Sequence, residues 1–342
     1  MTLIQTVDMA EWANLLESIS VTIQDYRAGE IDKPTPKHVE RWMMQFNESV
    51  QLPILRELDH VLKNTYYSRE KVQSFMEKLL TETDGSCDCD FWRKINFLRI
   101  QQQGQSQTEL LSIFDSVLEA KCGFNTDVCG SVDGYFLYFD DALFSGSRIG
   151  NDLDLWIEQD APTEATVTVI VIAGHTSGKW LAENRLKEKI ISLQKKIEVE
   201  CFADNWIENR KTYKRDTGVL WPSELPENEQ LSAYLELPHK YPFEPRPVGG
   251  KLGPFSSEEG RKVLEHELTL AGIRIRGFCQ NPKEIMRPLG FGYFGLGFGT
   301  MIVTFRNCPN NCPLALWWGD PDYSTNHSLG KWYPLFPRKT YT

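Results

Sequence analysis

Apolar residues recur at helical spacing through the first part of the chain. Trp42 and Phe46 lie four positions apart, and Leu55, Leu58 and Leu62 continue the spacing of an amphipathic helix. A second group follows Ser68, a residue typical of helix caps, at the same spacing: Val72, Phe75, Met76 and Leu79. The polar segment 83–90 interrupts this pattern, so residues 1–90 are predicted to form an N-terminal helical region.

From residue 91 to residue 203 the period of the apolar positions changes, and strand-like runs alternate with helical ones. The predicted strands span residues 96–100, 135–139, 166–172 and 197–202, and the helices between them end near residues 120, 157 and 193. Continuous apolar strands such as VTVIVI are typical of a buried, mostly parallel sheet. The pattern predicts an α/β fold with ligand-binding loops at the carboxyl ends of the strands.

Residues 204–342 are predicted to form a C-terminal insert and hood that completes this core. Residues 204–256 are rich in proline and aromatics, which favours extended structure over regular elements. A helix is predicted next, with Ser256 and Glu259 as its capping box and Gly272 ending it in the left-handed conformation. Glycines that alternate with aromatics, a strand over 300–305 and a Pro-Asn-Asn turn follow.

Net charge and cysteine content indicate which classes of protein this chain can belong to. The 342 residues carry a net charge of -10, which disfavours binding of polyanions over the whole surface, so any nucleic-acid contact must be local. The acidic N-terminus lacks the pattern of a secretory signal, and no apolar stretch reaches transmembrane length. The eight cysteines are therefore expected to be reduced thiols in a cytoplasmic protein.

The segment YFLYFDDALFSGSR, residues 135–148, carries the most specific chemistry. Its apolar strand ends in Asp140 and Asp141, which are expected to be exposed at the strand end and whose carboxylates can accept hydrogen bonds from the vicinal hydroxyls of a ribose. The loop that follows offers backbone N–H groups and hydroxyls to a 5-phosphate at a helix N-terminus. Gly146 is predicted to adopt the positive φ that such a loop needs and to permit close approach of the ligand. The predicted 5-phosphate loop comprises Ala142, Leu143, Phe144, Ser145, Gly146, Ser147 and Arg148.

A second polar loop precedes this segment by one strand and one helix. The strand INFLRI runs into QQQGQSQTELL, in which a glycine-containing turn leads to a helix N-terminus. Such a turn is suited to a diphosphate. The predicted pyrophosphate loop comprises Gln103, Gly104, Gln105 and Ser106.

The double-acid segment resembles the fingerprint of the type I phosphoribosyltransferases, in which two acids precede a Ser/Thr-Gly-x-Thr loop. Asp140, Asp141, Ser145 and Gly146 match it, whereas Arg148 replaces the last hydroxyl residue. Phe144 stands where purine-salvage members place a catalytic acid. The resemblance implies 5-phosphoribosyl-1-pyrophosphate (PRPP) as ligand, with Mg²⁺ held indirectly by Asp140 and Asp141.

Motifs along nearly the whole chain are similar to those of PRTase-CE, the phosphoribosyltransferase-like family of bacterial conflict systems. They are ERWMMQF, IQQQGQSQTELL, YFDDALFSGS and TFRNCPNNCPLALWW. This resemblance implies a toxic effector of an antiphage system, associated with a retron reverse transcriptase and its nucleic acid. Trp42, Phe46 and Leu55, or the basic run 209–215, are candidates for docking a partner, because a PRPP site needs neither.

Other interpretations of these motifs remain open. A partner-binding module could sense PRPP or a nucleotide without turnover, and the acceptor of a transfer reaction is not determined. His175, Asn310 and Asn311 are candidates for an acceptor pocket, although a loop histidine is often only solvated and the asparagines suit an Asx turn.

Three further motifs favour plainer interpretations. The Tyr-x-Asp-Asp motif of a polymerase palm should turn straight back into a strand, whereas helical spacing follows here. GHTSGKW departs from a P-loop and suits a strand-to-helix turn. The pairs Cys87/Cys89 and Cys308/Cys312 lack the spacing of zinc ribbons.

Overall fold

The computed structural model describes residues 3–81, 86–102, 104–132, 134–292 and 294–338. The chain divides into two compact units. Residues 69–208 form one unit, and residues 1–68 together with 209–342 form the other. Among the described residues no helix combines the length and the apolar character that crossing a membrane requires.

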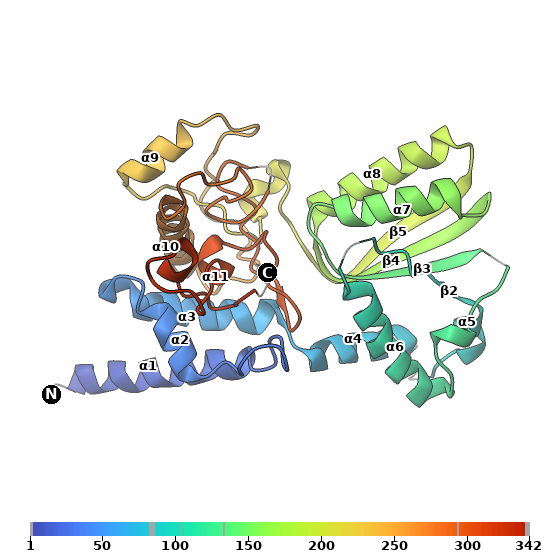
Figure 1. Ribbon diagram of the computed structural model, residues 1–342, viewed down its shortest axis with the longest axis horizontal. Helices are drawn as coiled ribbons and strands as arrows, with labels where there is room; N and C mark the ends of the chain where they lie inside the picture. The colour runs from blue at the N-terminus through green and yellow to red at the C-terminus, as the bar shows by residue number, and fades with distance from the viewer. Residues whose placement is uncertain (1–2, 82–85, 103, 133, 293, 339–342) are drawn as a thin grey trace. The chain divides into compact units, whose positions relative to one another are not determined.

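The unit of residues 69–208 contains a four-stranded parallel sheet with the order β2-β3-β4-β5 (Figure 1). Its strands are β2 (Asn96–Phe97), β3 (Tyr135–Leu143), β4 (Glu164–His175) and β5 (Lys196–Ile207). The helices α6 (Ser106–Cys122), α7 (Ser147–Gln159) and α8 (Thr176–Ser192) connect successive strands. Helices α4 (Arg69–Leu80) and α5 (Cys89–Lys94) precede the sheet, and a 3-10 turn, η1 (Thr126–Val128), follows α6.

The two faces of this sheet are covered by different helices. Phe136 packs against Trp156 of α7, whereas Phe139, an odd number of positions further along β3, packs against Phe114 of α6. Successive strand side chains point to opposite faces, so α6 and α7 lie on opposite sides. Figure 1 shows α7 and α8 together on one face and α4 and α6 on the other. Burial on both faces explains why the strands are continuously apolar.

The predicted α/β class is confirmed, and the predicted strands and helices of this unit are all present with shifted ends. β3, β4 and β5 are longer than predicted because they continue through polar residues at their carboxyl ends. β2 is shorter than predicted, since only Asn96 and Phe97 pair with β3. The predicted turn at GHTSGKW is the junction of β4 and α8, and a helix, not a second strand, follows Asp141.

The other unit joins the N-terminal helices to the C-terminal part of the chain. It comprises α1 (Leu3–Thr22), α2 (Pro36–Met43), α3 (Glu48–Thr65), α9 (Glu229–Leu235), α10 (Glu258–Gly277) and α11 (Leu314–Trp317). Two short strands, β1 (Tyr66–Tyr67) and β6 (Val303–Thr304), pair in parallel, and the 3-10 turns are η2 (Lys211–Asp216) and η3 (Ser328–Lys331). The predicted segments 1–90, 91–203 and 204–342 therefore do not coincide with the two units.

The apolar side chains of the N-terminal helices are buried within their own unit. Trp42 is fully buried, and its indole Nε1 donates to the Ala315 carbonyl at 2.7 Å. Phe46 packs edge-on against both Trp42 and Trp332. Leu55 belongs to the same core. These residues complete a core with the C-terminal segment, so the hypothesis that they form a partner surface is wrong.

Two predicted helix signals in α10 are also wrong. Ser257, not Ser256, is the N-cap and accepts from the Gly260 N–H, because Ser256 instead binds the carboxylate of Glu57. Gly272 does not end the helix, which continues to Gly277. A Cβ at Gly272 would lie 2.5 Å from Pro288 Cα, so this glycine permits a close approach of two segments.

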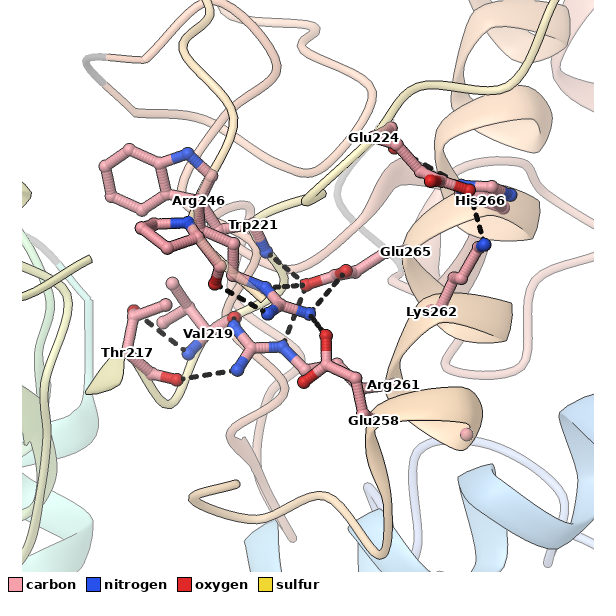
Figure 2. A network of polar contacts seen from close by, with 12 residues as sticks. Thr217, Val219, Trp221, Glu224, Arg246, Glu258, Arg261, Lys262, Glu265 and His266 are labelled. Atoms are coloured by element: carbon pink, nitrogen blue, oxygen red, sulfur yellow. Dashed lines mark hydrogen bonds and ion pairs between the residues drawn. The ribbon is translucent and has the colours of Figure 1, made fainter. Parts of the chain in front are cut away.

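A buried network of charged groups ties α10 to the proline-rich segment (Figure 2). Glu265 accepts from Arg261 Nε at 2.8 Å, from Arg246 Nη2 at 3.1 Å and from the Trp221 N–H at 3.0 Å. Arg261 also donates to the carbonyls of Thr217 and Val219. The side chains of Arg246, Arg261 and Glu265 are at most 1% exposed. Buried ion pairs and hydrogen bonds therefore hold the proline-rich segment, which includes η2 and α9, against α10.

One pair of cysteines is oxidised, contrary to the expectation that all are reduced. Cys89 and Cys122 form a disulfide, so the prediction that all eight thiols are reduced is wrong for these two. The other six are free. Cys308 and Cys312 are fully buried in the apolar core of their unit.

Candidate functional site

Asp140 and Asp141 lie in the last part of β3, at the carboxyl edge of the sheet. Asp140 is 1% exposed and Asp141 8% exposed, although the sequence pattern suggested a solvent-exposed pair. Asp140 pairs in register with Val171 of β4, and the backbone N–H of Asp141 donates to Asp140 Oδ1 at 2.8 Å. The strand therefore places two carboxylates at the edge where ligands bind in such sheets.

The two loops predicted separately from the sequence meet at Asp140. Ser106, the first residue of α6, donates from its hydroxyl to Asp140 Oδ1 at 2.6 Å and accepts from Gln101 Nε2 at 2.7 Å. Gly104 has a φ of +92°, and a Cβ there would lie 3.9 Å from Arg148 Nη1. Residues of both loops thus surround one carboxylate. The Ser106 side chain is directed to Asp140 within this arrangement.

The electrostatic environment of Asp140 is unfavourable for an isolated carboxylate. Burial, and next the charge of Asp141, raise the pKa of Asp140 from 3.8 to about 7, although Ser106 and Arg148 act in the opposite direction. Its Oδ2 is buried and has no hydrogen-bond partner among the residues that the structure describes. A buried, unpartnered carboxylate oxygen is a position where a hydroxyl group or a cation would lower the free energy.

Gly146 shapes the loop between β3 and α7. Its φ is +72°, the left-handed conformation that the sequence pattern predicted, and it precedes the first residue of α7. A Cβ at this position would lie 2.6 Å from the Gly178 carbonyl oxygen of α8. Glycine is therefore required by the packing of the loop against α8, so a Gly146→Val substitution reports on the fold as well as on ligand approach.

The rest of this loop is partly accessible. Leu143 and Phe144 are buried, Ala142 and Ser145 are half-buried, and Ser147 and Arg148 are exposed. The Ser147 N–H donates to Ser145 Oγ at 3.3 Å. Arg148 Nη1 lies 4.0 Å from Asp140 Oδ1, and the side chain is 53% exposed. Arg148 thus places an exposed positive charge near the Asp140 carboxylate.

Sequence reasoning missed Asp152, a buried carboxylate on α7. Asp152 is 2% exposed, accepts from the Tyr138 hydroxyl at 2.8 Å and accepts from the Gln102 N–H at 3.2 Å. Burial raises the pKa of Tyr138 well above its usual range, so the hydroxyl stays protonated and donates. Asp152 therefore holds Gln102, the residue directly before the predicted pyrophosphate loop, against α7. Asp152 lies four positions after Arg148, and no motif in the sequence around it predicts that it belongs to the site.

We expect Asp152→Ala to lower the free energy of unfolding by about 1–3 kcal/mol, because the Gln102 N–H and the Tyr138 hydroxyl lose their acceptor. Urea denaturation measures this loss, and hydrogen–deuterium exchange should show a faster Gln102 amide. Glu158→Ala is the control, since Glu158 on the same helix forms a surface ion pair with Lys189. Equal effects of the two substitutions would contradict the assigned role.

The residues predicted for an acceptor pocket lie in different units. His175 ends β4 and is fully buried, with its ring 5.0 Å from that of Phe144, so the interpretation as a solvated loop histidine is wrong. Burial lowers the pKa of His175 to about 3, which keeps the ring neutral. Asn310 and Asn311 belong to the other unit, where Asn311 Nδ2 donates to the Phe291 carbonyl at 2.8 Å. Gln103 lies outside the described residues.

The basic run 209–215 is partly neutralised within its own unit. Lys211 and Lys214 both pair with Glu244, and the Arg210 guanidinium lies 4.4 Å from the centre of the Tyr213 ring. Lys211 and Tyr213 are nevertheless exposed. Part of the run therefore remains available at the surface.

Comparison with known proteins gives one match. The family model described as PRTase-CE matches residues 39–338, which covers most of the chain, both loops and the whole sheet-containing unit. No match was found among curated proteins or among solved structures.

Proposed function

This chain belongs to the PRTase-CE family, whose name denotes a phosphoribosyltransferase-like protein, and from this premise we propose that it binds PRPP at the carboxyl edge of β3. The observation that carries the proposal is the buried Asp140, whose Oδ2 has no hydrogen-bond partner within the described part of the chain and whose Oδ1 is shared with the second loop. The proposed reaction transfers or releases ribose 5-phosphate from PRPP, with water or another acceptor.

The residues of the site have distinct proposed roles. Asp140 and Asp141 accept hydrogen bonds from the ribose hydroxyls, and their charge favours the positive charge that develops on the anomeric carbon as pyrophosphate leaves. The 5-phosphate binds at the N-terminus of α7, where Ser145 and Ser147 offer hydroxyls. Gly104 and Gln105 offer backbone N–H groups to the pyrophosphate. Arg148 supplies a positive charge between the two phosphate positions, in place of the hydroxyl common in this loop.

A magnesium ion fits this set of residues. Asp140 and Asp141 are consecutive residues with hard carboxylate oxygens, and the unpartnered Oδ2 of Asp140 is an acceptor that a hydrated Mg²⁺ or a ribose hydroxyl would satisfy. The proposed ion is held indirectly by these two carboxylates. When bound, it would supply charge neutralisation of the pyrophosphate oxygens.

A second candidate function is a sensor that binds PRPP or a nucleotide without turnover. One observation favours it: Phe144 is an apolar, buried residue that packs against His175, so the loop position next to the phosphate has no acid or base. His175 itself is neutral and fully buried, which disfavours it as a proton donor. Either function agrees with a role as an antiphage effector that a retron reverse transcriptase regulates, which we also propose.

The experiment that separates the two functions is incubation of the pure protein with PRPP and Mg²⁺, alone and with nucleotides or total RNA. We expect PRPP to bind, and a transferase should release pyrophosphate and add the mass of ribose 5-phosphate to an acceptor or to water. Binding measured by calorimetry without pyrophosphate release would favour the sensor. Absence of binding at millimolar PRPP would contradict both proposed functions. Weaker PRPP binding when Mg²⁺ is omitted would support the proposed magnesium ion.

A further inference from the structure

Three cysteines gather at the end of α6 that is remote from Asp140. Cys122 is the last residue of α6, and Cys89 is the first residue of α5. Helix α6 rises about 1.5 Å per residue, so its two ends lie roughly 24 Å apart. The cysteine cluster is therefore separate from the candidate site at Ser106 and Asp140, although both belong to the same unit.

The third cysteine has no place in a simple structural disulfide. Cys89 and Cys122 are bonded to each other, yet the sulfur of Cys87 lies 3.4 Å from the sulfur of Cys122 and 4.0 Å from that of Cys89. All three sulfurs lie within 4.8 Å of one another, and all three residues are half-buried. A disulfide alone needs only two of them. The position of Cys87 therefore indicates a use for three sulfurs together.

The distances fit a tetrahedral zinc thiolate. Zinc binds thiolate sulfur at about 2.3 Å, which places the sulfurs of a tetrahedral site about 3.8 Å apart. The two distances from Cys87, 3.4 and 4.0 Å, lie on either side of this value. The bonded pair would separate to a similar distance once its bond is reduced. The spacing Cys-x-Cys did not predict zinc, because the ligand that completes the set is 33 residues away from Cys89.

We propose that, after reduction of the Cys89–Cys122 bond, Cys87, Cys89 and Cys122 bind one Zn²⁺ ion. The reductant is a thiol of low molecular weight or a dithiol protein: two of its thiols are oxidised to a disulfide, and the Cys89 and Cys122 sulfurs take up the two electrons and two protons. Zinc then displaces the protons of the three thiols. A solvent molecule occupies the fourth position, which the half-buried setting allows. Oxidation and zinc binding exclude each other at this site.

The test uses the full chain, purified with and without a thiol reductant and then dialysed against Zn²⁺. We expect about one tightly held zinc ion per chain in the reduced protein and none in the oxidised protein, measured by elemental analysis. Cys87→Ser is the decisive variant, because it removes a ligand and leaves the disulfide pair intact. It should lose the zinc of the reduced protein while the oxidised protein still shows the Cys89–Cys122 bond by peptide mapping.

Cys129→Ser is the matched control. Cys129 is also half-buried in the same unit, and its thiol donates to the Asn125 carbonyl. This variant should keep the zinc. The proposal is overturned if the reduced wild-type chain holds no zinc, or if Cys87→Ser holds as much as the wild type. A Cys87–Cys122 disulfide in the oxidised protein without zinc in the reduced protein would also overturn it and would assign the third thiol to disulfide exchange.

Discussion

Replacement of Asp140 and Asp141 by asparagine together should abolish PRPP binding and leave the fold intact. The double substitution removes both negative charges that the proposed ribose and magnesium contacts require. The fold should persist because an asparagine Oδ1 at position 140 can still accept from Ser106 and from the backbone N–H of residue 141. Isothermal calorimetry with PRPP and Mg²⁺ measures the loss, which should exceed a hundredfold, or about 2.7 kcal/mol.

The same substitution should change the pH dependence of stability. The pKa of Asp140 is raised in the folded chain to about 7 from its ordinary value of 3.8, so between these pH values the folded protein holds a proton that the unfolded chain has lost. Stability therefore falls as the pH rises through this window. The asparagine variant avoids that loss. Its melting temperature should exceed that of the wild type at pH 8, and the difference should shrink towards pH 4.

Asp127→Asn is the control for both measurements. Asp127 lies in the same unit, and its side chain is 74% exposed and pairs with Arg99 at the surface. This variant should bind PRPP like the wild type and melt at nearly the same temperature. An unchanged PRPP affinity in the Asp140/Asp141 double variant would exclude the carboxylates as the binding site, whichever activity the protein has.

Glu265→Gln should destabilise the unit of residues 1–68 and 209–342 more than any surface substitution. Glu265 is the acid that the buried guanidinium groups of Arg246 and Arg261 share, and Glu258 also pairs with Arg246 (Figure 2). A neutral residue at position 265 would leave the two buried guanidinium groups with one neighbouring carboxylate, that of Glu258. Removal of one partner from a buried ion pair typically costs about 3–5 kcal/mol.

Chemical denaturation followed by tryptophan fluorescence measures this effect, since Trp221 is buried and adjoins Glu265. Glu224→Gln is the matched control, because Glu224 pairs with Lys262 next to the same helix but at the surface, where both side chains are about half exposed. The control should cost at most about 1 kcal/mol. Similar losses in the two variants would show that the buried network contributes no more than a surface pair.

Local pattern alone predicted the secondary structure of the sheet-containing unit and the two loops of its candidate site. The alternation of apolar strands and helices identified β3, β4, β5 and the helices between them, because the period of apolar residues is a property of neighbouring positions. The double acid, the Ser-Gly turn and the helix start are likewise contiguous. Gly146 adopts the left-handed conformation that this pattern predicted.

Only the tertiary structure decided which distant segments meet. The N-terminal helices could not be assigned to the C-terminal segment from sequence, since burial of Trp42 against Ala315 joins residues 273 positions apart. The contact of Ser106 with Asp140, the anchoring of Gln102 by Asp152 and the bond between Cys89 and Cys122 are equally non-local. Gly272 resembles a helix end in sequence, but the helix continues because tertiary packing outweighs the low intrinsic preference of one glycine.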